Sequence, residues 1–363
     1  MIANDYNQNH YNSVRYGVIA ALFSAALFGM STPMAKMLLG EISPLPLAGL
    51  LYLGSGIGLF LLSITRHLTT KEHMPFNEPK LKGSDYLYLA GAISCGGVAA
   101  PIFLIYGLSK TSGSMASLLL SIEGIFTTLV ASLIFRESVG RRVWMAAAIM
   151  FAASSILTYM PGPLGWSLQS GSILVILACL LWAFDNNLTR RLSHRNPFFI
   201  ALAKGLAAGF TTLAIAFAAG NKLPSFFPLT GALILGALSY GASLVFFVYA
   251  LRYLGTSRTS IYFGIAPFLG AALSIVLLRE PITLQMLAAA LFMLTGTGLV
   301  LKECHEHEHE HEVLSHEHRH IHDEHHNHEH GEGCQEPHCY EHEHGLLVHS
   351  HAHVPDLHHY HCH

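Results

Sequence analysis

One carboxylate, Glu123, lies near the middle of an apolar stretch that is long enough to cross a lipid bilayer. The stretch runs from Ser114 to Glu137 and ends on the charged pair Arg136-Glu137. A charged group at a bilayer centre costs about 2.5–3.5 kcal/mol on insertion scales, and such groups often mark a solute pathway or a proton relay. Burial also disfavours the charged form of a carboxyl group. We therefore predict that Glu123 handles a solute or a proton; the alternative is a structural carboxylate bonded to a neighbouring helix.

A second charged group, Lys204, lies in the apolar stretch 198–219, about six residues from its start. At 1.5 Å per residue this depth is roughly 9 Å, from which a lysine can extend its ammonium group to the membrane surface. That is the structural interpretation. The functional one is a contact with a counter-ion or with the solute, the partner being Glu123 or an anionic group of the solute. The neighbouring Gly205-x-x-x-Gly209 predicts a close helix contact.

Three polar residues, Asp185, Asn186 and Asn187, lie near one end of the apolar stretch 171–189, just before Arg190-Arg191. Short polar side chains at a helix end usually cap the helix or hold interfacial water. The other interpretation is a polar gate that lines the mouth of a pathway.

Aromatic residues and prolines are further candidates. The aromatic residues Trp182, Tyr249, Tyr262 and Phe263 either line a pathway or pack between helices. A proline within a membrane span frees backbone groups that must be bonded elsewhere, often beside a cavity. Three prolines interrupt predicted spans: Pro33, Pro101 and Pro267.

The chain from residue 303 to residue 363 holds 22 of the 26 histidines, and its net charge is −13. Imidazole is an effective ligand for Zn, Ni, Co and Cu. In an extended chain alternate residues share a face, so H-x-H-x-H presents neighbouring imidazoles. With few apolar residues this tail is predicted to be disordered, and it either binds several metal ions weakly or is only a solvated low-complexity segment. The predicted ligands are His305, His307, His309, His311, His316, His318, His320, His322, His325, His326, His328 and His330.

The rest of the chain is rich in apolar stretches that must position these groups. The whole sequence is 52% hydrophobic and 12% charged, about half the charged share of a soluble protein. A membrane-spanning helix needs roughly 20 predominantly apolar residues. Ten spans are predicted: 17–39, 44–65, 86–108, 114–135, 143–160, 171–189, 198–219, 228–251, 258–278 and 283–301.

Loop charges predict the orientation of these spans. Residues 1–302 carry 19 Lys and Arg against 9 Asp and Glu. With the N-terminus inside, 14 of these basic residues fall in cytoplasmic segments and 4 on the opposite side. Cytoplasmic loops are enriched in Lys and Arg. We therefore predict that both termini are cytoplasmic.

An internal repeat relates the two halves of the chain. The segment 106–157 aligns without a gap with 249–300, and ten of the 52 pairs are identical. The pair Arg136-Glu137 aligns with Arg279-Glu280, whereas Glu123 aligns with Ala266. Because each half has five predicted spans, an odd number, the second copy must be inverted in the membrane. Inverted repeats are common in transporters, whose solute sites lie near the bilayer midplane between the repeats.

The order of these motifs resembles a known family. Two five-helix repeats, each with an apolar helix, then "RE", then a last helix, are similar to the drug/metabolite transporter superfamily, in particular its EamA-type permeases. The segments LLLSIEGIFTTLVASLIFRE, LLWAFDNNLTRR and ALAKGLAAG resemble a bacterial subgroup with a His-rich tail. The resemblance implies a secondary transporter of small organic metabolites in the cytoplasmic (inner) membrane. It also includes Lys204.

The sequence thus predicts an all-α integral membrane protein that moves a small organic solute by alternating access, with coupling to protons through Glu123. No nucleophile–base pair or cofactor loop indicates an enzyme, and no cofactor or nucleic-acid partner is expected beyond Zn, Ni, Co or Cu on the tail. One alternative is a divalent-metal transporter fed by the tail, and another is a membrane-anchored metal buffer or sensor. The predicted divisions are a cytoplasmic N-terminus 1–16, repeats 17–160 and 171–301, and the tail 303–363.

Overall fold

The computed structural model describes a helical body and four strands of the tail. The described residues are 2–69, 81–135, 140–162, 165–192, 195–301, 305–311, 314–320, 338–344 and 347–353. The helices are α1 (Ile2–Gly29), α2 (Ser31–Leu38), α3 (Pro44–Thr69), α4 (Gly83–Ala92), the π-helix η2 (Ile93–Ala99), α5 (Ala100–Lys110), α6 (Gly113–Leu119), α7 (Ile122–Phe135), α8 (Arg141–Thr158), α9 (Ser170–Arg190), α10 (Pro197–Ala218), α11 (Phe226–Gly236), the π-helix η3 (Ala237–Ala242), α12 (Ser243–Phe263), α13 (Ala266–Leu278) and α14 (Leu284–Leu301).

Apolar helices build the body, because a bilayer cannot hydrogen-bond the backbone and every peptide group must find its partner within the helix. Within the described residues, seven helical segments are long and apolar enough to cross a membrane: Arg15–Leu38, Pro44–Thr65, Gly83–Lys110, Gly113–Ile134, Ser170–Arg190, Phe198–Ala218 and Phe226–Ala250. The other three predicted spans are also helical. They correspond to α8 and to two shorter apolar helices, Ala266–Leu278 and Leu284–Leu299.

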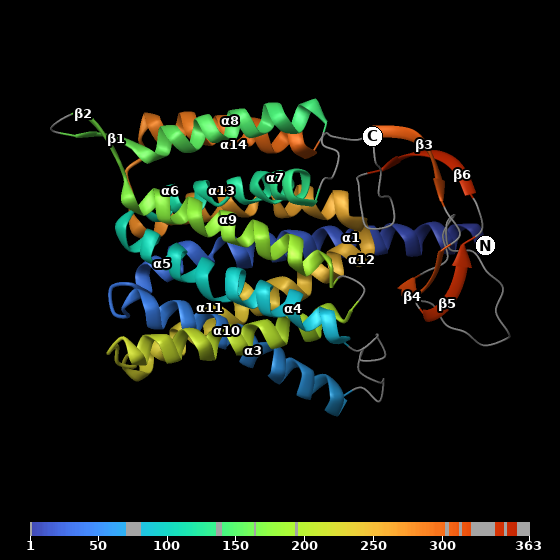
Figure 1. Cartoon of the computed structure of the whole chain (residues 1–363), viewed down its shortest axis with the longest axis horizontal. Helices are drawn as coiled ribbons and strands as arrows, with labels where there is room; N and C mark the ends of the chain where they lie inside the picture. The colour runs from blue at the N-terminus through green and yellow to red at the C-terminus, as the bar shows by residue number, and fades with distance from the viewer. Residues whose placement is uncertain are drawn as a thin grey trace.

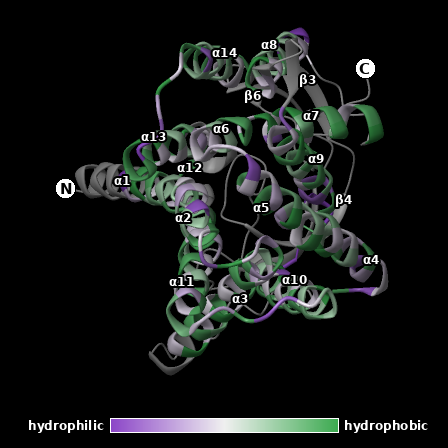
Figure 2. Ribbon diagram, turned by 90° about the vertical axis from the view of Figure 1, so that its left-hand side faces the viewer, coloured by the Kyte–Doolittle hydropathy of each residue, from purple (hydrophilic) through white to green (hydrophobic). Residues whose placement is uncertain are grey.

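The helices lie side by side with their axes roughly parallel (Figure 1). The start of α1 and the end of α14 lie at one end of the body, which we call the terminal end. A short hairpin of β1 (Tyr159–Gly162) and β2 (Gly165–Leu168) marks the opposite, hairpin end. Viewed from the hairpin end, α8 and α14 form one edge of the body, and α3, α10 and α11 form the opposite edge (Figure 2).

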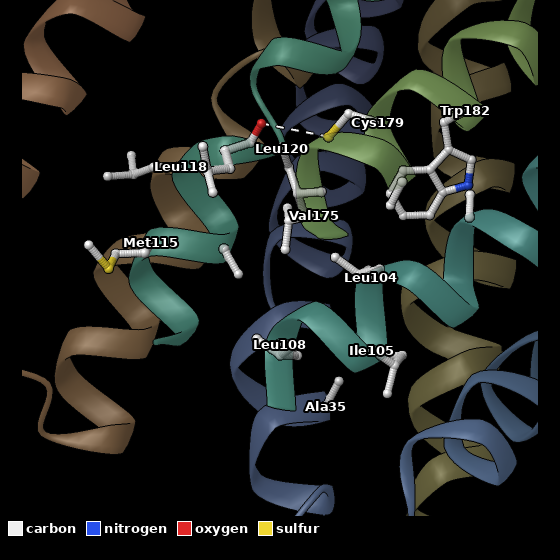
Figure 3. Close-up of a cluster of buried hydrophobic side chains, with 14 of the residues drawn as sticks. Ala35, Leu104, Ile105, Leu108, Met115, Leu118, Leu120, Val175, Cys179 and Trp182 are labelled. Carbon is white, nitrogen blue, oxygen red and sulfur yellow. Dashed lines mark hydrogen bonds between the residues drawn. The ribbon is translucent and has the colours of Figure 1, made fainter. Parts of the chain in front are cut away.

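A buried apolar cluster fills the body between these edges. It joins α2, α5, α6 and α9, and Figure 3 shows Leu104, Leu108, Leu118 and Val175 pointing into it. The Cys179 thiol lies 3.6 Å from the Leu119 carbonyl oxygen. Cysteine behaves here as the small core residue that an apolar stretch favours.

Glycines allow α3 to contact its neighbours closely. A Cβ atom added to Gly209 of α10 would lie 2.5 Å from the Leu53 nitrogen, and one added to Gly205 would lie 2.8 Å from the Gly56 nitrogen. The close contact predicted for Gly205 and Gly209 is therefore confirmed. On its other face, a Cβ atom at Gly54 would lie 2.2 Å from the Leu233 carbonyl oxygen of α11.

Two of the predicted spans, 114–135 and 258–278, are interrupted; Pro267 predicted the second interruption, whereas the first was not expected. The span 114–135 breaks between α6 and α7, where the Ser121 hydroxyl donates to the Leu118 carbonyl over 2.7 Å. The span 258–278 begins only at Ala266, because α12 continues through Phe263. Hydropathy alone cannot locate such breaks, since the residues on both sides are equally apolar. Pro267 lies in the first turn of α13, where a missing N–H does no harm. Pro101 lies within the continuous helix Gly83–Lys110, directly after η2.

Four strands are described within the tail, which the sequence predicted to be disordered. They are β3 (His305–His311), β4 (Leu314–His320), β5 (His338–His344) and β6 (Leu347–His353). The pairs β3–β6 and β4–β5 are antiparallel. The same alternation that predicted neighbouring imidazoles has the two-residue period of a strand, and strand pairing satisfies the backbone even where no core can form.

Candidate functional site

One helix, α9, carries most of the polar side chains inside the body. Trp182, Asp185 and Asn187 are buried on it, while Asn186 is exposed between them. α9 packs against α5, α7 and η2. Its polar residues therefore contact groups from several helices. One interpretation of the sequence had been that they cap the helix end.

Asp185 and Lys204 form an ion pair inside the body. The Lys204 ammonium donates to Asp185 Oδ2, and the two side chains are 19% and 3% exposed. Thr189 donates its hydroxyl to the other carboxylate oxygen over 3.1 Å. The pair lies against η2, where a Cβ atom at Gly96 would be only 1.9 Å from Asp185 Oδ2. Glycine at this position is therefore required for the carboxylate to fit.

The ion pair decides between the interpretations that the sequence left open for the Lys204 ammonium group. Its partner is Asp185, and neither Glu123 nor the membrane surface takes that place. A charge pair buried this deeply is costly to break, because removing one partner leaves the other uncompensated.

Glu123 lies in the first turn of α7, directly after the break that follows α6. The Asn186 amide donates to its carboxylate over 2.9 Å, and the same amide lies 3.2 Å from the Thr127 hydroxyl. The amide of Asn187 donates to the Thr127 carbonyl over 3.0 Å. The start of a helix carries a partial positive charge, which favours an anionic side chain there.

A third set of contacts surrounds Trp182. Its indole N–H donates to the Gly96 carbonyl over 3.0 Å and lies 3.3 Å from the Tyr52 hydroxyl. Tyr52 in turn donates to the same carbonyl over 2.7 Å. π-Helical turns leave carbonyl groups open to side chains, and η2 uses one of them to tie α3 to α9.

A cavity of about 330 Å³ opens beside Glu123, between the two interrupted helices. Its walls come from α1, α7, α8, α12, α13 and α14. The lining residues are Phe28, Leu120, Ser121, Glu123, Gly124, Ile125, Met150, Phe247, Phe263, Gly264, Ala266, Pro267 and Thr297. The ring centroid of Phe263 lies 5.4 Å from that of Phe28 and 4.9 Å from that of Phe247. Glu123 is thus the one charged residue of the lining, which also includes a group of three aromatic rings.

The other predicted pathway residues lie elsewhere. Tyr249 and Tyr262 pack against Ala20, Ala21 and Ala250 between α1 and α12, outside the residues that line the cavity. Sequence reasoning did not select Tyr52, Phe28 or Phe247. No spacing in the sequence marks them, because they reach the site only through helix packing.

Polar contacts also hold the two ends of the body. At the hairpin end, the Lys36 ammonium donates to the carbonyls of Leu108 and Thr111 over 2.6 and 2.8 Å. Glu280 accepts from the backbone N–H groups of Gly113 and Ser114 over 2.6 and 2.8 Å.

Glu280 belongs to the repeated "RE" pair, so one copy of this pair caps a helix of the other half. The first copy, Arg136-Glu137, lies outside the described residues. At the terminal end, Arg195 and Asp85 form an ion pair over 2.9 Å.

Metal ligands are not gathered in the described body. Where side chains are described, no group of three or more His, Cys, Asp and Glu could hold an ion. Of the predicted tail ligands, His322, His325, His326, His328 and His330 lie outside the described residues. The others lie in β3 and β4, of which the structure gives the backbone pairing.

Comparisons with known proteins agree on the class of protein. The model of the EamA-like transporter family matches residues 15–159 and 169–302. An uncharacterized transporter of Methanothermobacter thermautotrophicus is 29% identical over 296 residues, which are 77% of this chain and 84% of that protein. A solved crystal structure of a protein shares the fold, with a TM-score of 0.56 and 14% identity over 78% of this chain and 95% of the other.

Proposed function

Because this chain belongs to the EamA-like transporter family, we propose that it is a secondary transporter that moves a small organic solute by alternating access. It is a multi-pass membrane protein. The observation that carries the proposal is the position of Glu123. This carboxylate lies at a break in a membrane-spanning helix and lines a cavity whose walls come from both halves of the chain. Broken helices beside a cavity at the repeat interface are where transporters bind their solutes.

Paired irregularities in the two halves support the inverted repeat of ten helices. The π-helices η2 and η3 begin at Ile93 and Ala237, 144 residues apart. The starts of α7 and α13, Ile122 and Ala266, are also 144 residues apart. Rigid rocking of one repeat against the other exposes a central site to each side in turn. We place both termini in the cytoplasm, in line with the excess of basic residues on that side.

We further propose that Glu123 carries a proton in this cycle. The described residues give it a hydrogen bond from Asn186 but no ion pair. A charged carboxylate without a counter-ion is unfavourable in a membrane, so it must exchange a proton or a cation when the site changes its exposure. Asp185 is unsuited to this role because Lys204 neutralises it.

The test is a flux measurement in proteoliposomes. The purified full-length protein is reconstituted, loaded with a panel of small organic cations, zwitterions and anions, and solute loss is followed by mass spectrometry with and without a pH gradient. We expect at least one solute to leave faster than from protein-free liposomes, with a rate that depends on the gradient. Glu123→Gln should remove this dependence, and Glu41→Gln, an exposed carboxylate outside the cavity, should not. If no solute moves above the protein-free rate, the chain is not a transporter of this kind.

A metal-transport function is not supported by the body, whose cavity has one carboxylate and no His or Cys in its lining. The tail nevertheless has a specific feature. In β3 and β6, His305, His307 and His309 lie directly opposite His353, His351 and His349. Opposite residues in an antiparallel pair have Cβ atoms about 4.5–5.5 Å apart. We propose that these pairs bind Zn or Ni as an accessory store at the terminal end.

Calorimetry on the full-length protein tests whether pairing matters. Replacing His349, His351 and His353 by Ala should remove sites formed with β3 as well, so the loss of bound Zn should exceed that caused by replacing His325, His326 and His328. Equal losses would mean that the number of histidines alone sets binding. No Zn bound by the unaltered protein would remove the proposal.

A further inference from the structure

We infer that the cavity beside Glu123 accepts an organic monocation, with its charge at the carboxylate and its apolar body against Phe28, Phe247 and Phe263. This inference rests on the proposed function and names the solute class for the same site. It depends on three features of the cavity: its charge, its aromatic wall and its size.

Charge comes first. Glu123 is the one ionisable residue in the lining, and no Lys, Arg or His is present there. Lys204, which the sequence suggested as a counter-ion for Glu123, is held by Asp185. An anionic solute would meet an uncompensated carboxylate, whereas a cation would supply the missing counter-charge. In a low-dielectric site this difference is large.

The aromatic wall fits the same class. Phe263 lies between Phe28 and Phe247, with ring centroids 5.4 and 4.9 Å away, and the Phe247 ring is inclined to it by 64°. Ring faces attract cations within about 6 Å of the centroid, and desolvated cases are the strongest. Because the rings are tilted relative to one another, the cavity can offer a ring face to an amine or quaternary ammonium group.

Size and polarity exclude larger or strongly polar solutes. The volume of about 330 Å³ is at the lower end of the range of about 300–1,000 Å³ for small-molecule sites. Apart from Glu123, the side chains in the lining that carry a polar oxygen or nitrogen are Ser121 and Thr297. Ser121 already donates to the Leu118 carbonyl and Thr297 is one hydroxyl, so a sugar or a nucleotide would leave many polar groups unpaired.

Among the side chains that the structure describes around the carboxylate, none adds a net charge that would change this balance. Of the groups packed around the carboxylate, Asn186 is a neutral donor, and Thr127 is a neutral hydroxyl that accepts from the same amide. Asp185 and Lys204 cancel each other. The start of α7 contributes a partial positive charge, which holds the carboxylate in place when no cation is bound.

Three ligands that share a benzyl group but differ in charge test the inference. Binding of benzyltrimethylammonium, of its neutral isostere neopentylbenzene and of the anion phenylacetate is measured on the full-length protein in detergent by equilibrium dialysis. We expect the cation to bind at least about tenfold more tightly than the isostere, and phenylacetate to bind weakest.

Variants separate the contributions. Glu123→Gln, which keeps an acceptor for Asn186, should weaken cation binding by at least about 30-fold and leave the isostere unchanged. Phe263→Leu should weaken it by roughly 3- to 30-fold. Phe151→Leu, which removes an aromatic ring outside the lining, should change neither. Thermal unfolding of each variant checks that the fold is kept.

The outcomes distinguish the solute class from the transport function. Equal binding of cation and isostere, tighter binding of phenylacetate, no binding of the cation, or no effect of Glu123→Gln would overturn the inference. If the cation does not bind as expected while neutral or anionic solutes cross the proteoliposome membrane, the transporter proposal stands without this solute class. If the cation binds as expected but no solute crosses, the site stands and the transport function fails.

Discussion

The two breaks in the membrane helices have the same position in each half but different environments. After the first break, α7 begins at Ile122 and carries Glu123 beside Asn186 and a cavity. After the second, α13 begins with Ala266, which is 0% exposed. A Cβ atom at Gly29 would lie 2.6 Å from the Ala266 carbonyl oxygen. Both breaks border the cavity, but the first places a charged side chain there, whereas the second packs closely against α1.

The largest expected effect on stability comes from breaking the ion pair between Asp185 and Lys204. Lys204→Met should destabilise the fold by about 3–5 kcal/mol, because Asp185 would remain charged and buried without a partner. Adding Asp185→Asn should recover much of this loss, since no charge then remains. Thermal unfolding in detergent measures both variants. If the stability lost in the double variant equalled the sum of the losses in Lys204→Met and in Asp185→Asn alone, the two groups would not act as a pair.

At Ala266, which follows the second break, a charged side chain should not be tolerated. Ala266→Glu should cost about 3 kcal/mol, the penalty of an unpaired charge in a membrane helix, with added strain from the contact with Gly29. We expect a lower unfolding temperature and less inserted protein. A stable Ala266→Glu protein would mean that the two breaks are interchangeable.

Glu123→Gln should have the opposite effect to Ala266→Glu, because it should reduce transport and leave stability nearly unchanged. The substitution removes a charge without changing shape, so stability should change little. We expect solute flux to fall about a hundredfold, equivalent to about 2.7 kcal/mol in the barrier, and to lose its response to a pH gradient. Flux in proteoliposomes provides the measurement, and unaltered pH-dependent flux would remove Glu123 from the mechanism.

Size should matter more than polarity at Gly29. Gly29→Ala should destabilise the body by about 1–3 kcal/mol, because the added methyl group collides with backbone that cannot move away freely. Gly298→Ala is the matched control: no atom lies within 4 Å of a Cβ atom there, and alanine favours the helix by up to about 1 kcal/mol. Thermal unfolding should therefore move in opposite directions for the two variants.

The smallest expected effect is that of Asn186. Asn186→Ala removes the hydrogen bond to Glu123 but leaves an exposed position that water can fill. We expect a loss of about 1 kcal/mol in stability at most and a flux reduction well below that of Glu123→Gln. Comparing the flux of the two variants checks this order.

The sequence by itself determined that this is a membrane protein with helices at ten apolar stretches, since composition and length suffice for that inference. It also located Glu123 as a charge within a span and Gly205 and Gly209 as a packing contact. Pro267 marked the interruption of the span 258–278, but the sequence did not locate the break between α6 and α7, where helix and break are equally apolar, nor the strands of the tail. The tertiary structure decided which groups meet: it paired Lys204 with Asp185, placed Tyr249 and Tyr262 away from the cavity and brought Phe28 to Glu123. Such partners are distant in sequence, and only the packing of one helix against another determines which side chains share a buried space.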